Sequence, residues 1–589
     1  MTGEFFKQRR STSGAVTVTA RPSLGFRLLS GLGRRSLLQF GVVFLFAFVF
    51  LFLGMDRGFD YYDEGLILVG AMRVAAGQVP HRDFYANYGP GQFYTLAALF
   101  HLFGRYIFVE RMYDLTVRAS IVTVAYGIAK SYCRTWIAVC TAIVCGFWLF
   151  SPGLPSISYP IVPILLFSLV GSKVLLPVFE GKVAWQRMVG AGALTGLVAL
   201  FRYDVGAALA VVQTCSIGIA VWFMQSSRRP DWRAAASVLL PYWIGITVVF
   251  LPVALLYLSV APIHPWVHDI LLYPAKYYVR SRRLPLPRIY WRALENMALY
   301  LPIPVGLLGF FSLFLHRREG QGPGKNQRQT GFLILFGLLS MVFYFKGLVR
   351  ISVNQMLLAL IPMVLTLAVL YEFSSRRGIW LRRTIQWMMA ISIFAATWSA
   401  LKEVRVLHLY HGSVLEELLS APEPASVRSE IDWRGQPDTL HTGLWFLYSP
   451  IHSKLVSYLL GHTRPSETVF IGLPRHDRIL NNDLLTYFVA GRLPATRWSH
   501  FDPDLQTRAD IQRQMIHEID AQAVRFIVLE PEFDQANEPS NDSSKSSGVT
   551  LLDDYIRANY HPIQMFGDLS LLLRNGASAA PHQAGPADQ

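Results

Sequence analysis

Long apolar runs separated by short polar segments repeat along the first 400 residues of this chain. Runs of about 15 to 25 residues are long enough to cross a bilayer. Only 16% of the residues are charged and 52% are hydrophobic, whereas a soluble domain is about 25% charged. The pattern predicts a polytopic α-helical membrane protein with about 11 transmembrane helices. The predicted spans lie near residues 37–54, 112–129, 136–150, 158–178, 188–201, 205–224, 236–260, 297–315, 331–345, 354–373 and 384–400.

The distribution of Lys and Arg predicts how these spans are oriented. Residues 1–36 are basic, and no small-residue cleavage site follows the first apolar run, so we expect an uncleaved anchor with a cytoplasmic N-terminus. The basic loops 225–233, 316–329 and 374–383 fall on the same side when residues 92–104 are placed on the membrane surface. An odd number of spans sends the tail to the opposite face. We therefore predict a multi-pass protein of the inner (plasma) membrane.

Residues 37–400 form the predicted transmembrane domain. The tail that follows them has a different composition. Within residues 401–577, short apolar runs alternate with polar stretches of helical character such as 507–522. This alternation predicts an external (periplasmic) soluble α/β domain, with strands within 467–473 and 523–530. Residues 534–548 are expected to form a loop, and 578–589 a disordered tail.

An acidic stretch directly after the first span lies in the predicted first external loop, residues 55–111. It reads "FDYYDEGLILVGAMRVAAGQVPHRDFYANYGPG" (59–91) and supplies three candidate catalytic carboxylates, Asp63, Glu64 and Asp83. Apolar positions after Glu64 predict an amphipathic helix on the outer leaflet that ends near Gly77. Asp63 at its start has two interpretations: it caps the helix, or it accepts a proton from an acceptor hydroxyl. No role is assigned to Asp60.

Cations gather on the predicted outer face, against the usual bias of Lys and Arg toward the cytoplasm. They occur in the 261–296 loop, in "FRYD" (201–204) and in "KGLVRIS" (346–352). Charges at a membrane boundary usually face a cavity or a partner, and several cations around one cavity suit a lipid phosphate. Anchoring of lipid headgroups by long side chains is the alternative. The candidates for binding a donor phosphate are Arg202, Lys276, Arg280 and Arg350.

The order of these elements resembles the GT-C superfamily of membrane glycosyltransferases. It is similar to the glycosyltransferase family 39-like branch, which includes protein O-mannosyltransferases and lipid A aminoarabinose transferases. The resemblance rests on the basic N-terminus, the first span, the acidic stretch, "ERMYDLTVRAS" (110–120) and "FRYDVGAAL" (201–209). In those enzymes an Asp-Glu pair opens the first external loop and supplies the base, and Asp63 and Glu64 match it. The chain departs from an Arg-x-Asp-x-x-His motif, since "RISVNQ" (350–355) keeps Arg350 but has Ser352 and Gln355.

The resemblance implies a sugar donor carried on a polyprenyl phosphate, which the absence of a dinucleotide or P-loop glycine motif also favours. The expected reaction transfers the sugar with inversion to a hydroxyl of a protein, lipid or glycan acceptor. His81, Tyr88 and Asp204 are candidates for lining the substrate site. Membrane lipids are expected partners, and nucleic acid is not.

No metal ligands are assigned, although a divalent cation stays open as a cofactor. His264 and His268 have the spacing of a metal pair on a helix, but Pro265 lies between them and no third ligand is near in sequence. Two other functions remain as alternatives to an enzyme: a transporter or flippase for lipid or polysaccharide, and a non-catalytic subunit with a GT-C fold.

Overall fold

The computed structural model describes residues 34–55, 59–151, 157–224, 232–318, 325–374, 378–419, 450–502, 504–531 and 545–581. The basic N-terminal segment therefore lies outside the described residues except for 34–36. The end of the predicted tail, residues 582–589, and most of the predicted loop 534–548 also lie outside them.

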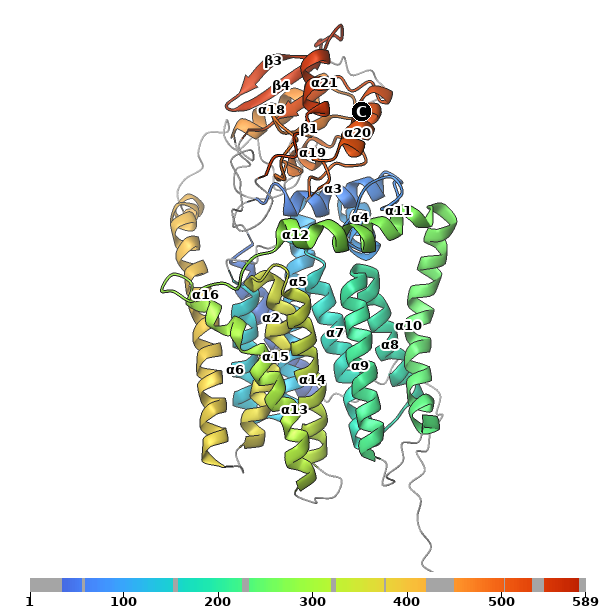
Figure 1. Ribbon diagram of the computed structural model, residues 1–589. Helices are drawn as coiled ribbons and strands as arrows, with labels where there is room; N and C mark the ends of the chain where they lie inside the picture. The colour runs from blue at the N-terminus through green and yellow to red at the C-terminus, as the bar shows by residue number, and fades with distance from the viewer. Residues whose placement is uncertain are drawn as a thin grey trace, which may run out of the picture.

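Eleven helices in the described part of the chain occupy the positions of the predicted spans (Figure 1). Among the described residues, eight helical segments are long and apolar enough to cross a membrane, so the chain is a multi-pass membrane protein. A count of about 11 spans stays a prediction. The eleven helices are α2 (Arg34–Phe52), α5 (Ile107–Tyr132), α6 (Thr135–Leu149), α7 (Ile161–Leu175), α8 (Trp185–Phe201), α9 (Tyr203–Met224), α10 (Trp232–Val260), α13 (Pro302–Arg318), α14 (Lys325–Gly347), α15 (Val353–Ser374) and α16 (Ile379–Leu419).

Burial separates the central helices of the bundle from its outer ones. Of the span Gln355–Ser374 in α15, 89% is buried inside the protein, against 6% for Arg35–Phe52 in α2 and 11% for Ala235–Val260 in α10. An apolar helix with so little protein around it must bury its side chains in lipid instead. α15 is therefore the core of the bundle, and α2 and α10 form part of its lipid-facing surface.

Short helices lie across one end of the bundle (Figure 1). They are α3 (Asp63–Ala75), α4 (Pro90–Phe103), α11 (Ile263–Val267), the π-helical turns η2 (His268–Leu272) and η3 (Pro274–Tyr278), and α12 (Val279–Arg282). The predicted helix after Glu64 is confirmed, and Gly77 follows its end with a φ of 84°. The open polar face expected of an amphipathic surface helix is wrong, because every residue from Glu64 to Arg73 is buried; its position on the outer leaflet stays a prediction. The sheet domain covers the face that the sequence pattern leaves to solvent.

The C-terminal part is a four-stranded sheet with helices, as predicted. The strand order is β1-β2-β4-β3, and only β1 and β2 are parallel. The predicted strands within 467–473 and 523–530 are β1 and β2, and the predicted helix 507–522 is α20. The elements are α18 (Pro450–His462), β1 (Phe470–Gly472), α19 (Leu485–Ala490), α20 (Ala509–Ala521), β2 (Phe526–Leu529), α21 (Leu551–Asn559), β3 (Tyr560–Phe566) and β4 (Leu569–Arg574).

The sheet domain packs directly on the start of α3. The backbone N–H groups of Leu484 and Leu485 both donate to the carbonyl oxygen of Tyr61, at 2.9 Å. The Tyr62 hydroxyl donates to the carbonyl oxygen of Phe501 at 2.5 Å. A Cβ atom on Gly65 would lie 2.4 Å from the backbone nitrogen of Leu485, so a glycine is required for this close approach. The acidic stretch is thus held between the bundle and the sheet domain.

Candidate functional site

A carboxylate caps the start of α3, but it belongs to Asp60. Asp60 Oδ1 accepts hydrogen bonds from the backbone N–H groups of Tyr62 (3.1 Å) and Asp63 (2.6 Å). These are the unpaired amides that a capping side chain satisfies at a helix N-terminus. The capping role that the sequence left open for Asp63 is therefore filled three residues earlier, and the Asp63 carboxylate is available for other contacts.

The surroundings of Asp63 hold its carboxyl group near the point of ionisation at neutral pH. Burial and the negative charge of Asp60 raise its pKa to about 6, while the Tyr159 hydroxyl and the charges of Arg282 and Arg350 oppose that rise. A carboxylate with this pKa is mostly ionised at pH 7 and is still basic enough to take a proton. This is the property required of a general base.

One predicted cation, Arg202, and a second cation, Lys346, both contact the predicted carboxylate Asp204. Arg202 Nη2 lies 3.0 Å from Asp204 Oδ2, and Lys346 Nζ lies 3.3 Å from the same oxygen. The Asp204 side chain is 51% exposed, so this triad borders space that a polar ligand can reach. The Arg202 guanidinium carbon also lies 5.6 Å from the centre of the Tyr88 ring, a cation–π distance.

Gly89 explains how Tyr88 comes so near to Arg202. Its N–H donates to the carbonyl oxygen of Phe201 at 3.0 Å. A Cβ atom at this position would lie 2.2 Å from the carbonyl oxygen of Leu200. Only glycine allows the loop to contact the end of α8 in this way, so the "NYGPG" turn has a structural reason for its glycine.

Arg282 and Arg350 are brought together by backbone pairing at the end of α12. The N–H of Leu284 donates to the carbonyl oxygen of Val349 at 3.1 Å. Ser352 at the start of α15 accepts a long hydrogen bond of 3.4 Å from the Gln355 N–H through its hydroxyl. The two positions that depart from the family motif therefore interact with each other at a helix start.

The sheet domain contributes Asp502 to the same site. Arg282 Nη2 donates to Asn481 Oδ1 at 3.1 Å and lies 3.5 Å from Asp502 Oδ1. Burial raises the pKa of Asp502 to about 6, and the positive charges of Arg282 and Arg350 oppose this. No local sequence pattern marks Asp502 as a site residue, because it lies in a domain that is predicted to be separate.

Glu64 is held in a buried ion pair instead of facing these cations. Arg111 Nε lies 2.7 Å from Glu64 Oε1 and Arg111 Nη2 2.9 Å from Oε2, and the two side chains are 2% and 0% exposed. Arg111 also donates to the carbonyl oxygen of Met55 at 2.7 Å. The pair joins α3 to α5, and the geometry favours Asp63 over Glu64 as the base.

Four other predicted site residues have different surroundings. Asp83 pairs with its neighbour Arg82 at 2.6 Å and accepts the Val79 N–H at 2.7 Å. His81 is buried, with Nδ1 3.3 Å from Asp269 Oδ2. Lys276 is exposed, and its Nζ lies 5.0 Å from the centre of the Tyr277 ring. Arg280 belongs to α12, but its side chain lies outside what the structure describes.

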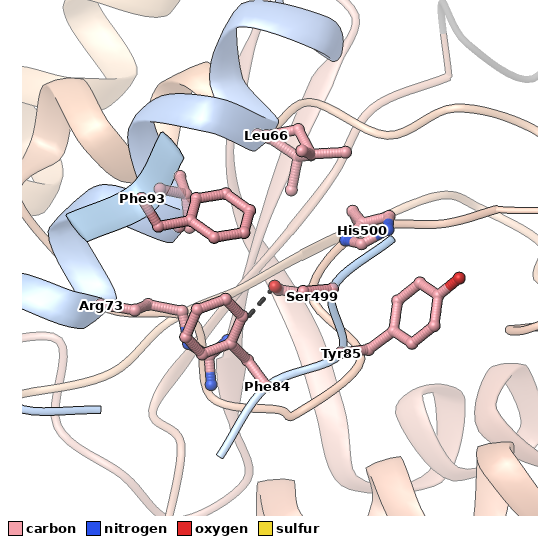
Figure 2. A pocket seen from close by; sticks show the side chains of 11 residues that line it. Leu66, Arg73, Phe84, Tyr85, Phe93, Ser499 and His500 are labelled. Carbon is pink, nitrogen blue, oxygen red and sulfur yellow. Dashed lines mark hydrogen bonds between the residues drawn. The ribbon is translucent and has the colours of Figure 1, made fainter. Parts of the chain in front are cut away.

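A small cavity lies where α3 meets the sheet domain (Figure 2). Its lining includes Leu66, Arg73, Phe93 and His500, and its volume is about 10 Å³. Arg73 crosses this boundary, donating to the Thr496 carbonyl oxygen at 3.0 Å and to Ser499 Oγ at 3.2 Å. A space of this size holds one water at most, so the cavity is a packing feature of the joint and no substrate fits it.

Metal ligands do not gather around Asp63 in the described residues. His264 is exposed and His268 Nδ1 lies 3.2 Å from Asp269 Oδ1, and this pair does not belong to a group of three side chains close enough to hold an ion among the described residues. Among the residues that the structure describes, one group of three side chains is close enough to hold an ion, and it lies in the sheet domain.

Comparison with known proteins identifies the fold. No protein-family model matches the sequence, and no curated protein matches it. The crystal structure of ArnT from Cupriavidus metallidurans bound to undecaprenyl phosphate is similar, with a TM-score of 0.50, 12% sequence identity, and coverage of 93% of this chain and 99% of that one. The chain therefore has the GT-C fold that the sequence resemblance implies, while the exact family stays a prediction.

Two further solved structures were found. The archaeal oligosaccharyltransferase AglB from Archaeoglobus fulgidus, in complex with an inhibitory peptide and a dolichol-phosphate, has a TM-score of 0.41 at 10% identity, covering 85% of this chain and 70% of that one. The arabinofuranosyltransferase AftD from Mycobacteria has a TM-score of 0.47 at 12% identity, covering 92% of this chain and 42% of that one.

Proposed function

We propose that the protein is a membrane glycosyltransferase that takes a sugar from a polyprenyl-phosphate donor. The sugar is transferred with inversion to an acceptor hydroxyl at the end of the bundle that carries the sheet domain. This end faces the periplasm or exterior, and the N-terminus faces the cytoplasm. The observation that carries the proposal is the Asp63 carboxylate at that end, which has a pKa of about 6 and lies near enough to Arg282 and Arg350 for their charges to influence that pKa.

In the proposed reaction Asp63 acts as the general base. It takes the proton of the acceptor hydroxyl while the oxygen attacks the anomeric carbon. The bond between that carbon and the phosphate oxygen breaks, and the electron pair leaves with the polyprenyl phosphate. A single displacement of this kind inverts the anomeric configuration.

The cations supply the second requirement, which is stabilisation of the phosphate as its negative charge grows. Arg350 and Arg282 are near enough to Asp63 to influence its pKa. Arg202 and Lys346 both contact Asp204, whose side chain is half exposed. Arginine suits this task because its planar guanidinium donates two parallel hydrogen bonds to phosphate oxygens. The bound undecaprenyl phosphate of the similar ArnT structure supports a donor of this class.

The direct test measures donor cleavage by the purified protein. A panel of radiolabelled polyprenyl-phosphate sugars is incubated with protein in lipid nanodiscs together with crude acceptor membranes. We expect one donor to release polyprenyl phosphate in step with transfer of label, and the product to have the opposite anomeric configuration. Movement of an intact donor across a sealed bilayer would instead indicate a flippase, and donor binding without release a non-catalytic subunit.

A further inference from the structure

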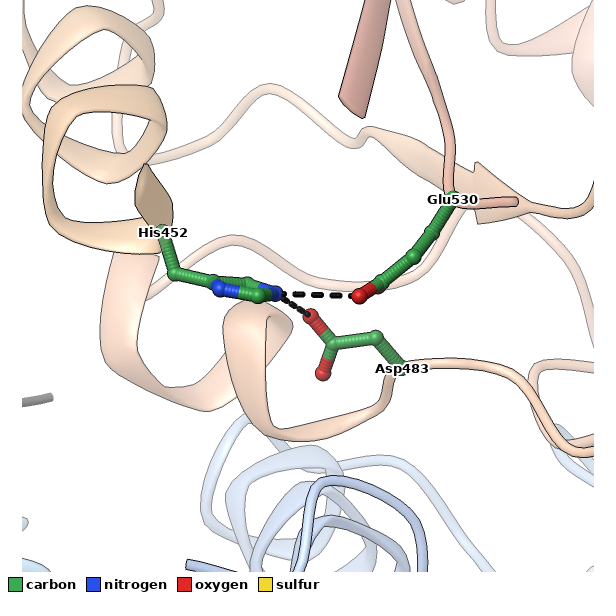
Figure 3. Close-up of side chains that lie close together, drawn as sticks. All are labelled: His452, Asp483 and Glu530. Atoms are coloured by element: carbon green, nitrogen blue, oxygen red, sulfur yellow. Dashed lines mark hydrogen bonds and ion pairs between the residues drawn. The ribbon is translucent and has the colours of Figure 1, made fainter. Parts of the chain in front are cut away.

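Three buried side chains converge at one point in the sheet domain (Figure 3). His452 comes from α18, Asp483 from the segment before α19, and Glu530 from the residue that follows β2. Their side chains are 7%, 1% and 2% exposed. His452 Nε2 faces both carboxylates, at 3.1 Å from Glu530 Oε1 and 3.7 Å from Asp483 Oδ2.

The spacing of these atoms is close to that of the ligands around a metal ion. One nitrogen and two carboxylate oxygens lie within 4.8 Å of one another. With metal–ligand bonds of about 2.0 to 2.2 Å, tetrahedral coordination separates the ligand atoms by about 3.3 Å. The two measured distances from His452 bracket this value, so small side-chain movements are enough to close the site around an ion.

The charges also favour a cation. Two carboxylates share a buried space with one imidazole. Such crowding of like charges is unfavourable unless a positive charge compensates it. An imidazole supplies at most one positive charge, whereas a divalent ion neutralises both carboxylates.

The cluster lies at the contact between the sheet domain and the acidic stretch. The His452 ring packs against the Tyr61 ring, with centroids 4.7 Å apart. The residues directly after Asp483 donate the two hydrogen bonds to the Tyr61 carbonyl oxygen. Tyr61 precedes the base candidate Asp63 by two positions, so the cluster is part of the support for that segment.

We propose that His452, Asp483 and Glu530 bind a divalent cation of the zinc type. Three protein ligands with mixed nitrogen and oxygen atoms match the coordination that Zn²⁺ accepts, with water in a fourth position. Mg²⁺ and Ca²⁺ prefer sites made entirely of oxygen atoms. The bound ion ties α18, the end of β2 and the start of α19 together, and so stabilises the sheet domain and its contact with Tyr61.

Zinc content and thermal stability test this site without any activity assay. Untagged protein in detergent is stripped with chelator, dialysed with Zn²⁺ and then against metal-free buffer, and its zinc is measured by mass spectrometry. We expect one equivalent of retained zinc and a higher Tm when Zn²⁺ is present. Wild-type protein that retains no zinc and shows no Tm change would overturn the proposal, as would equal retention of Mg²⁺ or Ca²⁺.

Variants locate the ion. Glu530→Gln keeps the side-chain size and His452→Ala removes the nitrogen ligand, and each is expected to weaken zinc binding at least tenfold and to abolish the Tm response. Asp553→Asn is the matched control, because Asp553 forms another buried contact in this domain, 2.6 Å from His476 Nδ1. It should retain one equivalent of zinc. Retention by both cluster variants would also overturn the proposal, and the wild-type measurement decides even if a variant fails to fold.

Discussion

The buried side chains of α3 and α5 and the side chains around Asp63 both include several charges, but they balance these charges differently. Glu110, which is buried in α5, accepts the backbone N–H of Ser158. Two other buried carboxylates each have an arginine: Glu64 pairs with Arg111, and Asp114 with Arg118 at 2.6 Å. These four side chains are 0% to 2% exposed. Pairs closed in this way leave no charge for a ligand. The Glu64–Arg111 pair connects α3 to α5, and the Asp114–Arg118 pair lies within α5.

Around Asp63, in contrast, some charged side chains are partly exposed, and some carboxylates and cations share their ion-pair partners. Asp204 is contacted by two cations at once and is half exposed, and Asp502 reaches Arg282 from another domain. We call this group the Asp63 cluster: its carboxylates are Asp63, Asp204 and Asp502, and its cations are Arg202, Arg282, Lys346 and Arg350. The comparison teaches that an open, cation-rich arrangement can accept an anion, whereas closed pairs cannot.

The largest expected effect on turnover comes from a substitution of Asp63, the proposed base of the Asp63 cluster. Asp63→Asn removes the proton acceptor but keeps the shape, so turnover should fall by about 10²- to 10⁴-fold. Donor binding and Tm should stay near wild type, because Asp60 provides the helix cap. Release of polyprenyl phosphate in single-turnover assays measures this. A wild-type rate in this variant would remove Asp63 from the chemistry.

Glu64→Gln tests the closed pair with the opposite kind of effect. Breaking one partner of a buried ion pair typically costs about 3–5 kcal/mol, so we expect a lower Tm and a smaller yield of folded protein. Turnover per folded molecule should stay close to wild type. Thermal unfolding in detergent, combined with active-site titration, separates the two readouts. A variant with normal Tm and no turnover would make Glu64 the base.

Arg350→Gln tests whether the cations of the Asp63 cluster bind the donor phosphate. Loss of a charge-assisted hydrogen bond costs about 1.5–3 kcal/mol, which corresponds to roughly ten- to a hundred-fold weaker donor binding. Titration with a non-hydrolysable polyprenyl-phosphate analogue measures the change, and Arg82→Gln, on the exposed flank, is the matched control. Equal affinity in both variants would exclude Arg350 from the phosphate site.

The pH profile gives a smaller effect that depends on the Asp63 surroundings. Because the base must be ionised, kcat/KM should rise with pH through the pKa of about 6 and fall about tenfold per unit below it. Asp60→Asn keeps a capping side chain but removes the neighbouring negative charge, so the acid limb should move to lower pH. An acid limb that does not move would show that Asp60 and Asp63 are electrostatically independent.

Asp83→Asn should have the smallest effect. Its ion pair with Arg82 is partly exposed, and exposed pairs contribute about 0–1 kcal/mol. Turnover within twofold of wild type and an unchanged Tm are expected in the same assays. A loss of turnover comparable to that of Asp63→Asn would place the base at Asp83 and contradict the distinction between the Asp63 cluster and the exposed Asp83–Arg82 pair.

Much of the fold and part of the site could be predicted from the sequence. Apolar runs place the helices, since a residue's need for lipid or a protein core is a property of the run itself. The alternation of short apolar and polar segments predicts the sheet domain. Asp63, Arg202, Asp204 and Arg350 are visible in the sequence as charges near the ends of apolar runs, and Tyr88 belongs to the acidic stretch.

What only the tertiary structure decided depends on partners far away in the chain. The sequence at Asp60, Asp63 and Glu64 offers three adjacent carboxylates with no means of assigning them. In the folded protein Asp60 accepts hydrogen bonds from the helix amides, Asp63 belongs to the Asp63 cluster, and Glu64 pairs with Arg111. The same holds for the buried position of α3 and for Asp502, which both depend on the sheet domain. Periodicity reports which faces are apolar, but the long-range contacts that pair, bury or expose a charge are formed only when distant segments pack together.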